Sequence, residues 1–301
     1  MPIFSTEHAR SFFESIGFAV EDIPEAEAEG QKRADLRVTI GEEEYVVEAK
    51  FRSPHREWYE VLQRAEAGEF ATTTREVEPW RTLSDVIQKA RAQLAATPAS
   101  TSAFRILWVV APHSDDSFVI PCIEKQLLGV RQLFVYQAED FSKNFGASPT
   151  LRQCYYFEDN DFERYPEIDA AMLFAQDGGQ LFVNHFSPNR DRFRRSRLYE
   201  VVSGKGAVID ADVLRRDGKA LMLDTDFGRP RGAGAQQTYL RVKHDILVNV
   251  VHESHWKGVA VVPVRTTSSA AEKEAEHFAA EEGDGAVSAT EEKANGEHDG
   301  G

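Results

Sequence analysis

The residues best suited to chemistry are two carboxylates and a lysine, Asp35, Glu48 and Lys50. Glu48 follows Asp35 by thirteen positions, and one apolar residue, Ala49, separates Glu48 from Lys50. Grouping two carboxylates and a lysine is costly, because like charges repel and burial penalises each charge. A hard divalent cation resolves this conflict, since Mg²⁺ takes one or two carboxylates, several waters and a substrate phosphate as ligands.

A β-hairpin must position these residues. Two short runs that alternate between apolar and polar residues flank a Gly-containing turn, which is the pattern of a hairpin with one buried face. If Ile40 pairs with Tyr45 across the turn, the antiparallel register puts Asp35 opposite Lys50. Glu48 then lies one side-chain repeat away on the same face, so we expect the three polar groups to converge.

The same residues resemble the PD-(D/E)XK nuclease superfamily, whose fold is that of restriction endonucleases. The mark of that superfamily is an acidic residue on one strand and Glu-apolar-Lys on the next, here Asp35 and then Glu48-Ala49-Lys50. The proline that usually precedes the first acidic residue is replaced by Ala34. The resemblance covers residues 3–137 and rests on a motif of moderate specificity.

The resemblance implies a role for each residue of the hairpin. Asp35, Glu48 and the Ala49 carbonyl would bind Mg²⁺, for which Mn²⁺ is expected to substitute. Lys50 would orient the attacking water or stabilise the developing negative charge. The implied reaction is hydrolysis of a phosphodiester by in-line attack of water.

Two flanking helices supply further candidates through the same resemblance. The superfamily tends to place a Glu on the preceding helix and a Gln or basic residue on the following helix. Glu7 fits the first position, where it would assist a second ion, and Gln93 fits the second, with Gln88 as its competitor. Either side chain would equally suit an ordinary helix surface.

An interpretation of the motif without a functional site stays open. In a chain with 50 acidic residues, Glu-x-Lys recurs by chance, and Glu291 and Lys293 form another copy near the C-terminus. The hairpin face would then be an alternation of solvated charges. A further Asp-x-Lys begins at Asp217-Gly218, a pair that is typical of a type I′ turn, and we interpret it as the tip of a hairpin.

The charge of the chain is unevenly distributed. Of a net charge of −15, residues 266–301 carry −8, from ten acidic residues and two lysines, which leaves −7 for the rest. This segment is rich in Glu, Ala and Gly, and we expect it to be a disordered acidic tail. Basic clusters at 189–197 and 229–244 keep a local nucleic-acid groove compatible with the overall acidity.

The first basic cluster interleaves arginines with Phe193, a composition that can follow a nucleic-acid backbone. The alternative is a solvated helix face on which Asp191 and Glu200 compensate the arginines. The candidate contacts are Arg190, Arg192, Arg194, Arg195 and Arg197.

Composition and apolar segments limit the class of protein. Hydrophobic residues make up 42% of the chain and charged residues 28%, which is typical of a globular protein. No apolar run approaches the roughly 18 residues that a membrane span requires, and the N-terminus does not have the pattern of a secretory signal. We therefore expect a cytoplasmic protein with two reduced, buried cysteines, Cys122 and Cys154.

The pattern of elements predicts an α/β protein with a restriction-endonuclease-like mixed sheet flanked by helices. Residues 1–145 would form the nuclease-like core, with α-β-β-α-β-α-β order over residues 1–137. Residues 146–265 would form an α+β extension or second lobe, with one helix over 236–251, followed by the tail. Whether this half extends the first sheet is left open by the pattern.

These expectations lead to three hypotheses on function. The first is a Mg²⁺-dependent nuclease, with DNA as the expected partner and endonucleolytic cleavage in DNA defence or processing as the expected role. The second is a catalytically inactive nucleic-acid-binding module of the same fold. The third is an acidic α/β interaction protein without a nuclease site. The first hypothesis is compatible with a homodimer.

Overall fold

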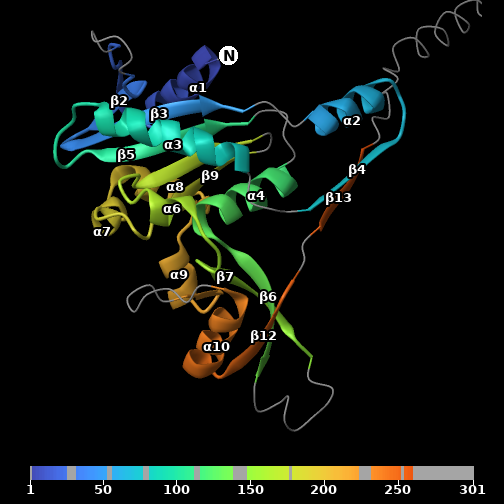
Figure 1. Ribbon diagram of the computed structural model, residues 1–301. Helices are drawn as coiled ribbons and strands as arrows, with labels where there is room; N and C mark the ends of the chain where they lie inside the picture. Colours follow the sequence, from blue (N-terminus) through green and yellow to red (C-terminus); the bar gives the residue numbers. More distant parts are fainter. Residues whose placement is uncertain are drawn as a thin grey trace, which may run out of the picture.

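The computed structural model shows a mixed α/β protein with three sheets and flanking helices (Figure 1). The residues that it describes are 2–25, 32–52, 56–76, 81–111, 116–137, 148–175, 178–223, 232–251 and 254–259. The expected tail lies outside these residues. Within them, no helix has the length and apolar character needed to cross a bilayer.

A seven-stranded mixed sheet forms the upper part of the molecule (Figure 1). The strand order is β1-β2-β3-β5-β8-β9-β10. β3, β5 and β8 are parallel to one another, β9 and β10 form a second parallel pair, and the remaining neighbours are antiparallel. The strands are β1 (Ala19–Asp22), β2 (Leu36–Ile40), β3 (Glu43–Phe51), β5 (Phe104–Val110), β8 (Ala170–Phe174), β9 (Gly179–Val183) and β10 (Val208–Ile209).

Helices cover both faces of this sheet, and the alternation of β3 assigns each face. Tyr45, Val47 and Ala49 pack with α1 (Pro2–Ser15) in one hydrophobic core. Val46, one residue out of phase, packs with α3 (Arg81–Ala96) and α4 (Asp116–Leu128) in the other core. The period of two along a strand therefore places Glu48 and Lys50 on the α3 face.

A second sheet lies below the first and has the order β11-β7-β6-β12 (Figure 1). Together with α9 and α10 we call it the lower lobe, residues 131–137, 148–158, 211–223 and 232–251. Leu240 of α10 packs on one face of this sheet, against Leu133 and Cys154. Its elements are β6 (Arg131–Gln137), β7 (Thr150–Tyr155), α9 (Ala211–Arg216), β11 (Ala220–Met222), α10 (Ala233–His244) and β12 (Ile246–Val250).

A two-stranded ribbon projects beside the first sheet (Figure 1). β13 (Ser254–Val259) pairs antiparallel with β4 (Ala71–Glu76), and α2 (Arg56–Glu66) packs against β4 through Trp58 and Val61. Three short helices complete the described fold: α6 (Asp161–Arg164), α7 (Arg190–Phe193) and α8 (Arg197–Ser203).

Several expected elements differ from the observed ones. Within residues 1–137, β1, α2 and β4 are additional to the expected α-β-β-α-β-α-β order. The helix expected over 236–251 ends at His244, because Asp245 adopts a left-handed conformation and starts β12. Asp217-Gly218 does form a turn, but it ends helix α9 instead of joining two strands.

The boundary expected at residue 145 does not separate the two large sheets. The upper sheet takes β8, β9 and β10 from beyond that residue, and the lower lobe takes β6 from before it. The cysteine expectation is confirmed, since Cys122 and Cys154 are both buried and unbridged. Burial raises the pKa of the Cys154 thiol to about 12.

Gly129 joins the end of α4 to β6 in a left-handed conformation, with φ of +57°. A Cβ at this position would overlap the backbone carbonyl oxygen of Glu158. We expect Gly129→Ala to lower the free energy of unfolding by about 3 kcal/mol, about 1 for the backbone and about 2 for the overlap. Denaturant unfolding measures this change.

Gly206→Ala is the matched control. Gly206 also has a positive φ, of +71°, but a Cβ there meets no atom within 4 Å. Its expected loss is therefore only the backbone contribution of about 1 kcal/mol. Equal losses for the two variants would contradict the predicted overlap at Gly129.

Candidate functional site

The hairpin of β2 and β3 brings Asp35 beside Glu48. β2 and β3 pair Ile40 with Glu43, which leaves a two-residue loop in which Gly41 has φ of +57°. A positive φ at the first loop residue alone is the pattern of a type II′ turn, for which glycine is favoured. The predicted pairing of Ile40 with Tyr45 is therefore wrong by two residues.

This shift changes the partner of Asp35 but not its face. The observed register ends at the pair of Leu36 and Val47, and the Asp35 amide also donates to the Val47 carbonyl, so the Asp35 carboxyl lies beside Glu48. Two residues are one full side-chain period, so all three side chains remain on the same face. The convergence predicted from the alternation is therefore present with a different cross-strand pair.

Asp35 is anchored to the backbone of β3. Its amide donates to the Val47 carbonyl at 3.1 Å, and its Oδ2 accepts from the Ala49 amide at 2.8 Å. Because the N–H and C=O of one strand residue point to the same neighbouring strand, the Ala49 carbonyl also faces the Asp35 side. Burial raises the pKa of Asp35, although the Ala49 amide and the Lys50 charge oppose that shift.

Glu48 is a fully buried carboxyl, with 0% of its surface exposed. Its Oε1 accepts a hydrogen bond from Lys50 Nζ, and its Oε2 has no hydrogen-bond partner among the residues that the structure describes. Burial raises its pKa to about 8, and the neighbouring Asp35 carboxylate adds to that shift. Burial of an unpartnered carboxylate oxygen is costly when Glu48 is ionised, and Lys50 then supplies one positive charge for two carboxylates.

Gln93 of α3 links Lys50 to the start of the hairpin. Its Oε1 accepts from Lys50 Nζ at 2.9 Å, and its Nε2 donates to the Arg33 carbonyl at 3.1 Å. One turn further along, Thr97 Oγ1 accepts from the Ala34 amide at 2.8 Å. These bonds fix the end of α3 over the carboxylates.

The competing glutamine and the candidate on α1 lie elsewhere. Gln88 is exposed on α3, so the structure brings Gln93 and not Gln88 to the hairpin. Glu7 is exposed on α1, which packs against the opposite face of the sheet from Glu48. A site role for Glu7 stays a prediction that this geometry does not support.

Arg52 is a partly buried cation on the same face, two residues beyond Lys50, and the motif did not single it out. Burial lowers the pKa of Arg52, an effect that the charge of Asp85 on α3 opposes. The period of two along β3 was the signal that could have identified it. Its guanidinium adds positive charge to this face at the end of β3.

The acidic groups present limit the kind of metal centre. Within the described ranges, no three His, Cys, Asp or Glu side chains group as metal ligands. Asp35 and Glu48 therefore offer two carboxylates, with the Ala49 carbonyl as the third protein oxygen on that side. This set is insufficient for a closed all-protein zinc site but matches the one or two carboxylates that Mg²⁺ usually takes.

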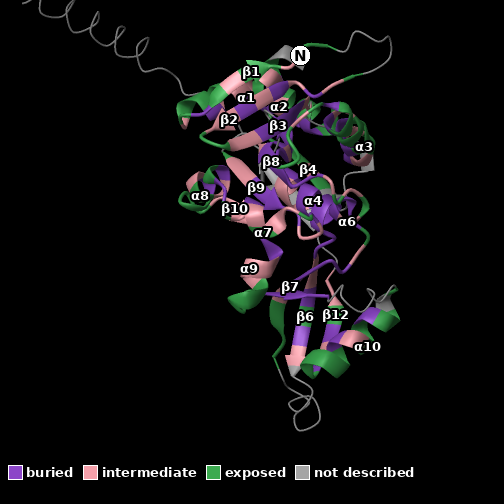
Figure 2. Cartoon of the chain, turned by 90° about the vertical axis from the view of Figure 1, so that its left-hand side faces the viewer, coloured by how far each residue is buried: buried purple, intermediate pink, exposed green. Residues whose placement is uncertain are grey.

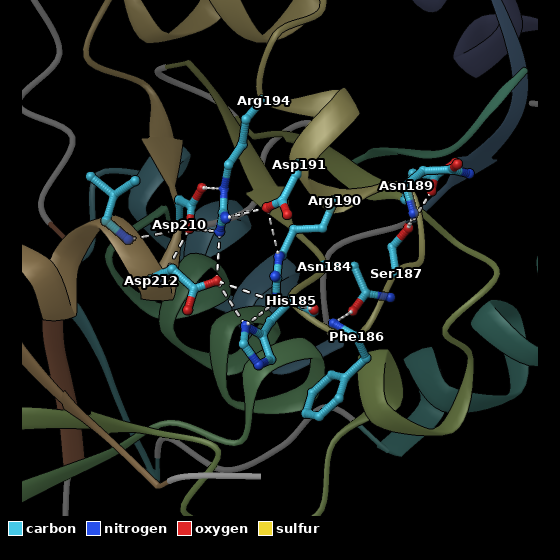
Figure 3. A network of polar contacts seen from close by, with 12 residues as sticks. Asn184, His185, Phe186, Ser187, Asn189, Arg190, Asp191, Arg194, Asp210 and Asp212 are labelled. Carbon is cyan, nitrogen blue, oxygen red and sulfur yellow. Dashed lines mark hydrogen bonds and ion pairs between the residues drawn. The ribbon is translucent and has the colours of Figure 1, made fainter. Parts of the chain in front are cut away.

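The five arginines predicted to contact nucleic acid divide into two groups. Arg194 binds Asp210 through two hydrogen bonds of 2.7 Å and Asp212 through one of 2.6 Å, as Figure 3 shows. Arg190 donates to the His185 carbonyl at 3.0 Å. Arg192 donates to the Ser102 carbonyl and lies 3.9 Å from the centre of the Phe104 ring. These three arginines thus bind other segments of the chain.

The other two arginines, Arg195 and Arg197, are exposed. Arg197 pairs with Glu200 at 2.8 Å, which is the compensation that the alternative interpretation expected. A nucleic-acid contact at these two positions stays a prediction.

The contact between His185 and Asp212, at the centre of the same network, was not predicted from the sequence. His185 Nδ1 lies 2.7 Å from Asp212 Oδ2 (Figure 3), and 27 positions separate the two residues. Burial opposes ionisation of Asp212, but hydrogen bonds from His185 and Arg194 outweigh it and hold its pKa well below the usual range. No local pattern predicts this pairing, because it joins the segment after β9 to the start of α9.

The raised pKa of Glu48 predicts how stability depends on pH in the metal-free protein. With a pKa of about 8 against an ordinary value of 4.5, the folded state holds this proton more tightly than the unfolded state. The resulting stabilisation is complete below the unfolded value and is lost as pH rises through the folded value. Wild type should therefore lose stability relative to Glu48→Gln between about pH 5 and about pH 9.

Urea unfolding of both proteins in a chelator measures this difference. Both proteins share every other titrating group, Asp35 included. The difference between their unfolding free energies therefore isolates the contribution of Glu48. The same difference in unfolding free energy at both pH values would contradict the raised pKa.

Comparisons of the chain with protein-family models, with curated proteins and with solved structures found no match.

Proposed function

We propose that this protein is a Mg²⁺-dependent nuclease that hydrolyses phosphodiester bonds, with DNA as the substrate. The observation that carries the proposal is the buried carboxylate pair Asp35 and Glu48, with Lys50 hydrogen-bonded to Glu48 on the same face. A structural ion pair alone would explain Lys50 and one carboxylate oxygen. It leaves Oε2 of Glu48 without a hydrogen-bond partner among the described residues, and it leaves one lysine for two adjacent carboxyl groups.

The donor set fits a hard divalent cation. Asp35, Glu48 and the Ala49 carbonyl would hold Mg²⁺, with Mn²⁺ as a substitute, and waters or a substrate phosphate would complete the coordination. Bound there, the ion would polarise the phosphodiester and lower the pKa of a water. Asp35 is preorganised for this role, because the Ala49 amide orients its carboxylate.

Lys50 supplies the positive charge beside the reacting group. Its ammonium group is held by Glu48 and Gln93, so it points to the carboxylate face instead of into solvent. In this position it can donate to the attacking water or to the oxygens of the phosphate as negative charge develops. Arg52, on the same face, would bind a neighbouring phosphate of the strand.

Removal of either carboxylate or of the lysine should strongly lower the rate of cleavage. We expect Asp35→Asn, Glu48→Gln and Lys50→Gln each to lower the rate of Mg²⁺-dependent cleavage of plasmid DNA by about 10²–10⁴-fold. Single-turnover cleavage with Mg²⁺ or Mn²⁺ measures the change.

Glu42→Gln and Lys89→Gln are the charge-matched controls, since both residues are exposed and lie outside the carboxylate face. These variants should cleave at the wild-type rate. The proposal would be contradicted if wild type left single-stranded, duplex and plasmid DNA intact. It would also be contradicted if the hairpin variants cleaved as well as wild type. Salt-sensitive DNA binding without cleavage would instead support an inactive binding module.

Gln93 acts through Lys50 and is therefore a positioning residue. We expect Gln93→Ala to lower kcat by about tenfold or more with a smaller change in KM, because the lysine loses a hydrogen bond that orients it. The larger change in kcat than in KM is the result that a loss of folding alone would not give.

Gln88→Ala is the control on the same helix, because Gln88 is exposed one turn or more away from the hairpin. It should leave both kcat and KM unchanged. A Gln93→Ala enzyme with wild-type kcat would show that Gln93 has no more than a structural role.

A further inference from the structure

A group of basic side chains lies on the lower lobe, away from the carboxylate hairpin. The described residues of this lobe contain seven Lys or Arg and four Asp or Glu, a net charge of +3. The whole chain carries −15. The lobe is therefore locally positive in a protein whose overall charge repels polyanions.

Several of these cations converge from three separate elements. Arg152 of β7 reaches the turn after α9, where its Nη2 donates to the Gly218 carbonyl at 2.6 Å. At the end of α10, burial lowers the pKa of His244, and the nearby charges of Lys243, Arg152 and Arg215 lower it further. Arg152, Arg215, Lys243 and His244 thus share one region, which we call the basic patch.

The fold explains why these four residues meet. Arg152 and Cys154 are two residues apart on β7 and so point to the same face, and Cys154 packs beneath α10. α9 packs along β11, the strand next to β7, so its last turn lies at the same edge. Figure 2 shows exposed residues at the ends of both helices.

Exposed cations flank the basic patch and extend it. Arg216 and Lys219 border the turn after α9 and are exposed. Three acidic groups lie near them. Asp217 is 3.5 Å from Arg216 and 3.8 Å from Lys219, Asp212 is 3.7 Å from Arg215, and the exposed Asp245 directly follows His244. The cations exceed these acids in number, so the surface keeps a positive charge.

This surface differs from the arginine cluster at 190–197. There, Asp210 and Asp212 bind Arg194 at hydrogen-bond distance, and Arg190 and Arg192 are engaged by backbone carbonyls. In the basic patch, Arg152 also donates to a backbone carbonyl and Lys243 donates to the Tyr239 hydroxyl at 2.7 Å, but Arg215, Lys243 and His244 are exposed at the ends of helices. A polyanion can reach these side chains without breaking a buried ion pair.

We propose that the basic patch binds the phosphate backbone of duplex DNA, an inference that rests on the nuclease function proposed for the hairpin. Lys and Arg side chains that neutralise phosphates supply sequence-independent affinity through release of counterions. The patch holds the substrate on the lower lobe while the carboxylate hairpin acts on it. Its side chains position the duplex and do not take part in the chemical step.

The test compares binding of a fluorescein-labelled duplex DNA at several salt concentrations, with Ca²⁺ in place of Mg²⁺. The variants are Arg152→Gln/Arg215→Gln/Lys243→Gln and, with the Gly218 contact kept, Arg215→Gln/Lys243→Gln. The charge-matched control is Arg56→Gln/Arg64→Gln/Lys205→Gln, at exposed positions on α2 and after α8. Thermal unfolding verifies that each variant is folded.

We expect each patch cation removed to lower the slope of log K against log salt by about one and to weaken binding for every sequence alike. The control should retain the wild-type slope and affinity. Patch variants that fold and bind with the wild-type slope would overturn the proposal, and so would wild type that binds duplex DNA without salt dependence. Equal loss in the control would also overturn it, because the effect would be that of net charge.

The same proteins distinguish failure of this inference from failure of the nuclease proposal. At saturating plasmid with Mg²⁺, the patch variants should cleave at the wild-type rate, since the hairpin is intact. If wild type binds DNA through the patch but never cleaves it, the result would support the patch and contradict the nuclease proposal. If the patch variants cleave as fast as wild type at low DNA concentration, the result would contradict the patch proposal alone.

Discussion

Burial of the Glu48 carboxyl beside Asp35 is the constraint on which the candidate site depends. A carboxyl with no exposed surface and a second carboxyl across the hairpin is tolerated only if other groups compensate it. Lys50 supplies one counter-charge, and the Ala49 amide supplies one hydrogen bond to Asp35. The compensation is incomplete within the described protein, and this incompleteness is what distinguishes the pair from an ordinary ion pair of the core.

The architecture keeps that pair in place from two directions. β3 lies between β2 and β5 in the sheet, so its backbone is held on both sides while Glu48 points to the α3 face. The end of α3 is tied to the start of the hairpin through Thr97 and Gln93. Displacement of α3 would therefore break the bonds to the backbone of residues 33 and 34 together with the bond from Lys50, so the helix supports the site and also covers the core.

The sequence predicts the local features of this site and not the non-local ones. The common face of Asp35, Glu48 and Lys50 follows from a period of two, and it survives an error of two residues in the register for the same reason. The choice of Gln93 over Gln88 needed the packing of α3, since both positions lie on the same helix. The strand β12 was missed because an apolar run after α10 suits helix and strand alike until the left-handed Asp245 separates them. That β8 to β10 join the first sheet is a long-range pairing that no local pattern contains.

The two basic clusters show why composition alone does not assign a nucleic-acid surface. The run at 189–197 is visible in the sequence, yet Asp210 and Asp212, beyond α8 and β10, neutralise Arg194. Of the patch, only Lys243 and His244 fall in the run at 229–244, and the fold adds Arg152 and Arg215 from elsewhere in the chain. The difference lies in which acidic residues the fold brings near, and those residues are distant in sequence. A cation held by a buried carboxylate must lose that bond before it can bind a phosphate, so its contribution to affinity is reduced by the cost of the unpaired carboxylate. An exposed cation on a locally positive lobe has no such cost, and the net charge of the whole chain therefore says little about where a polyanion would bind.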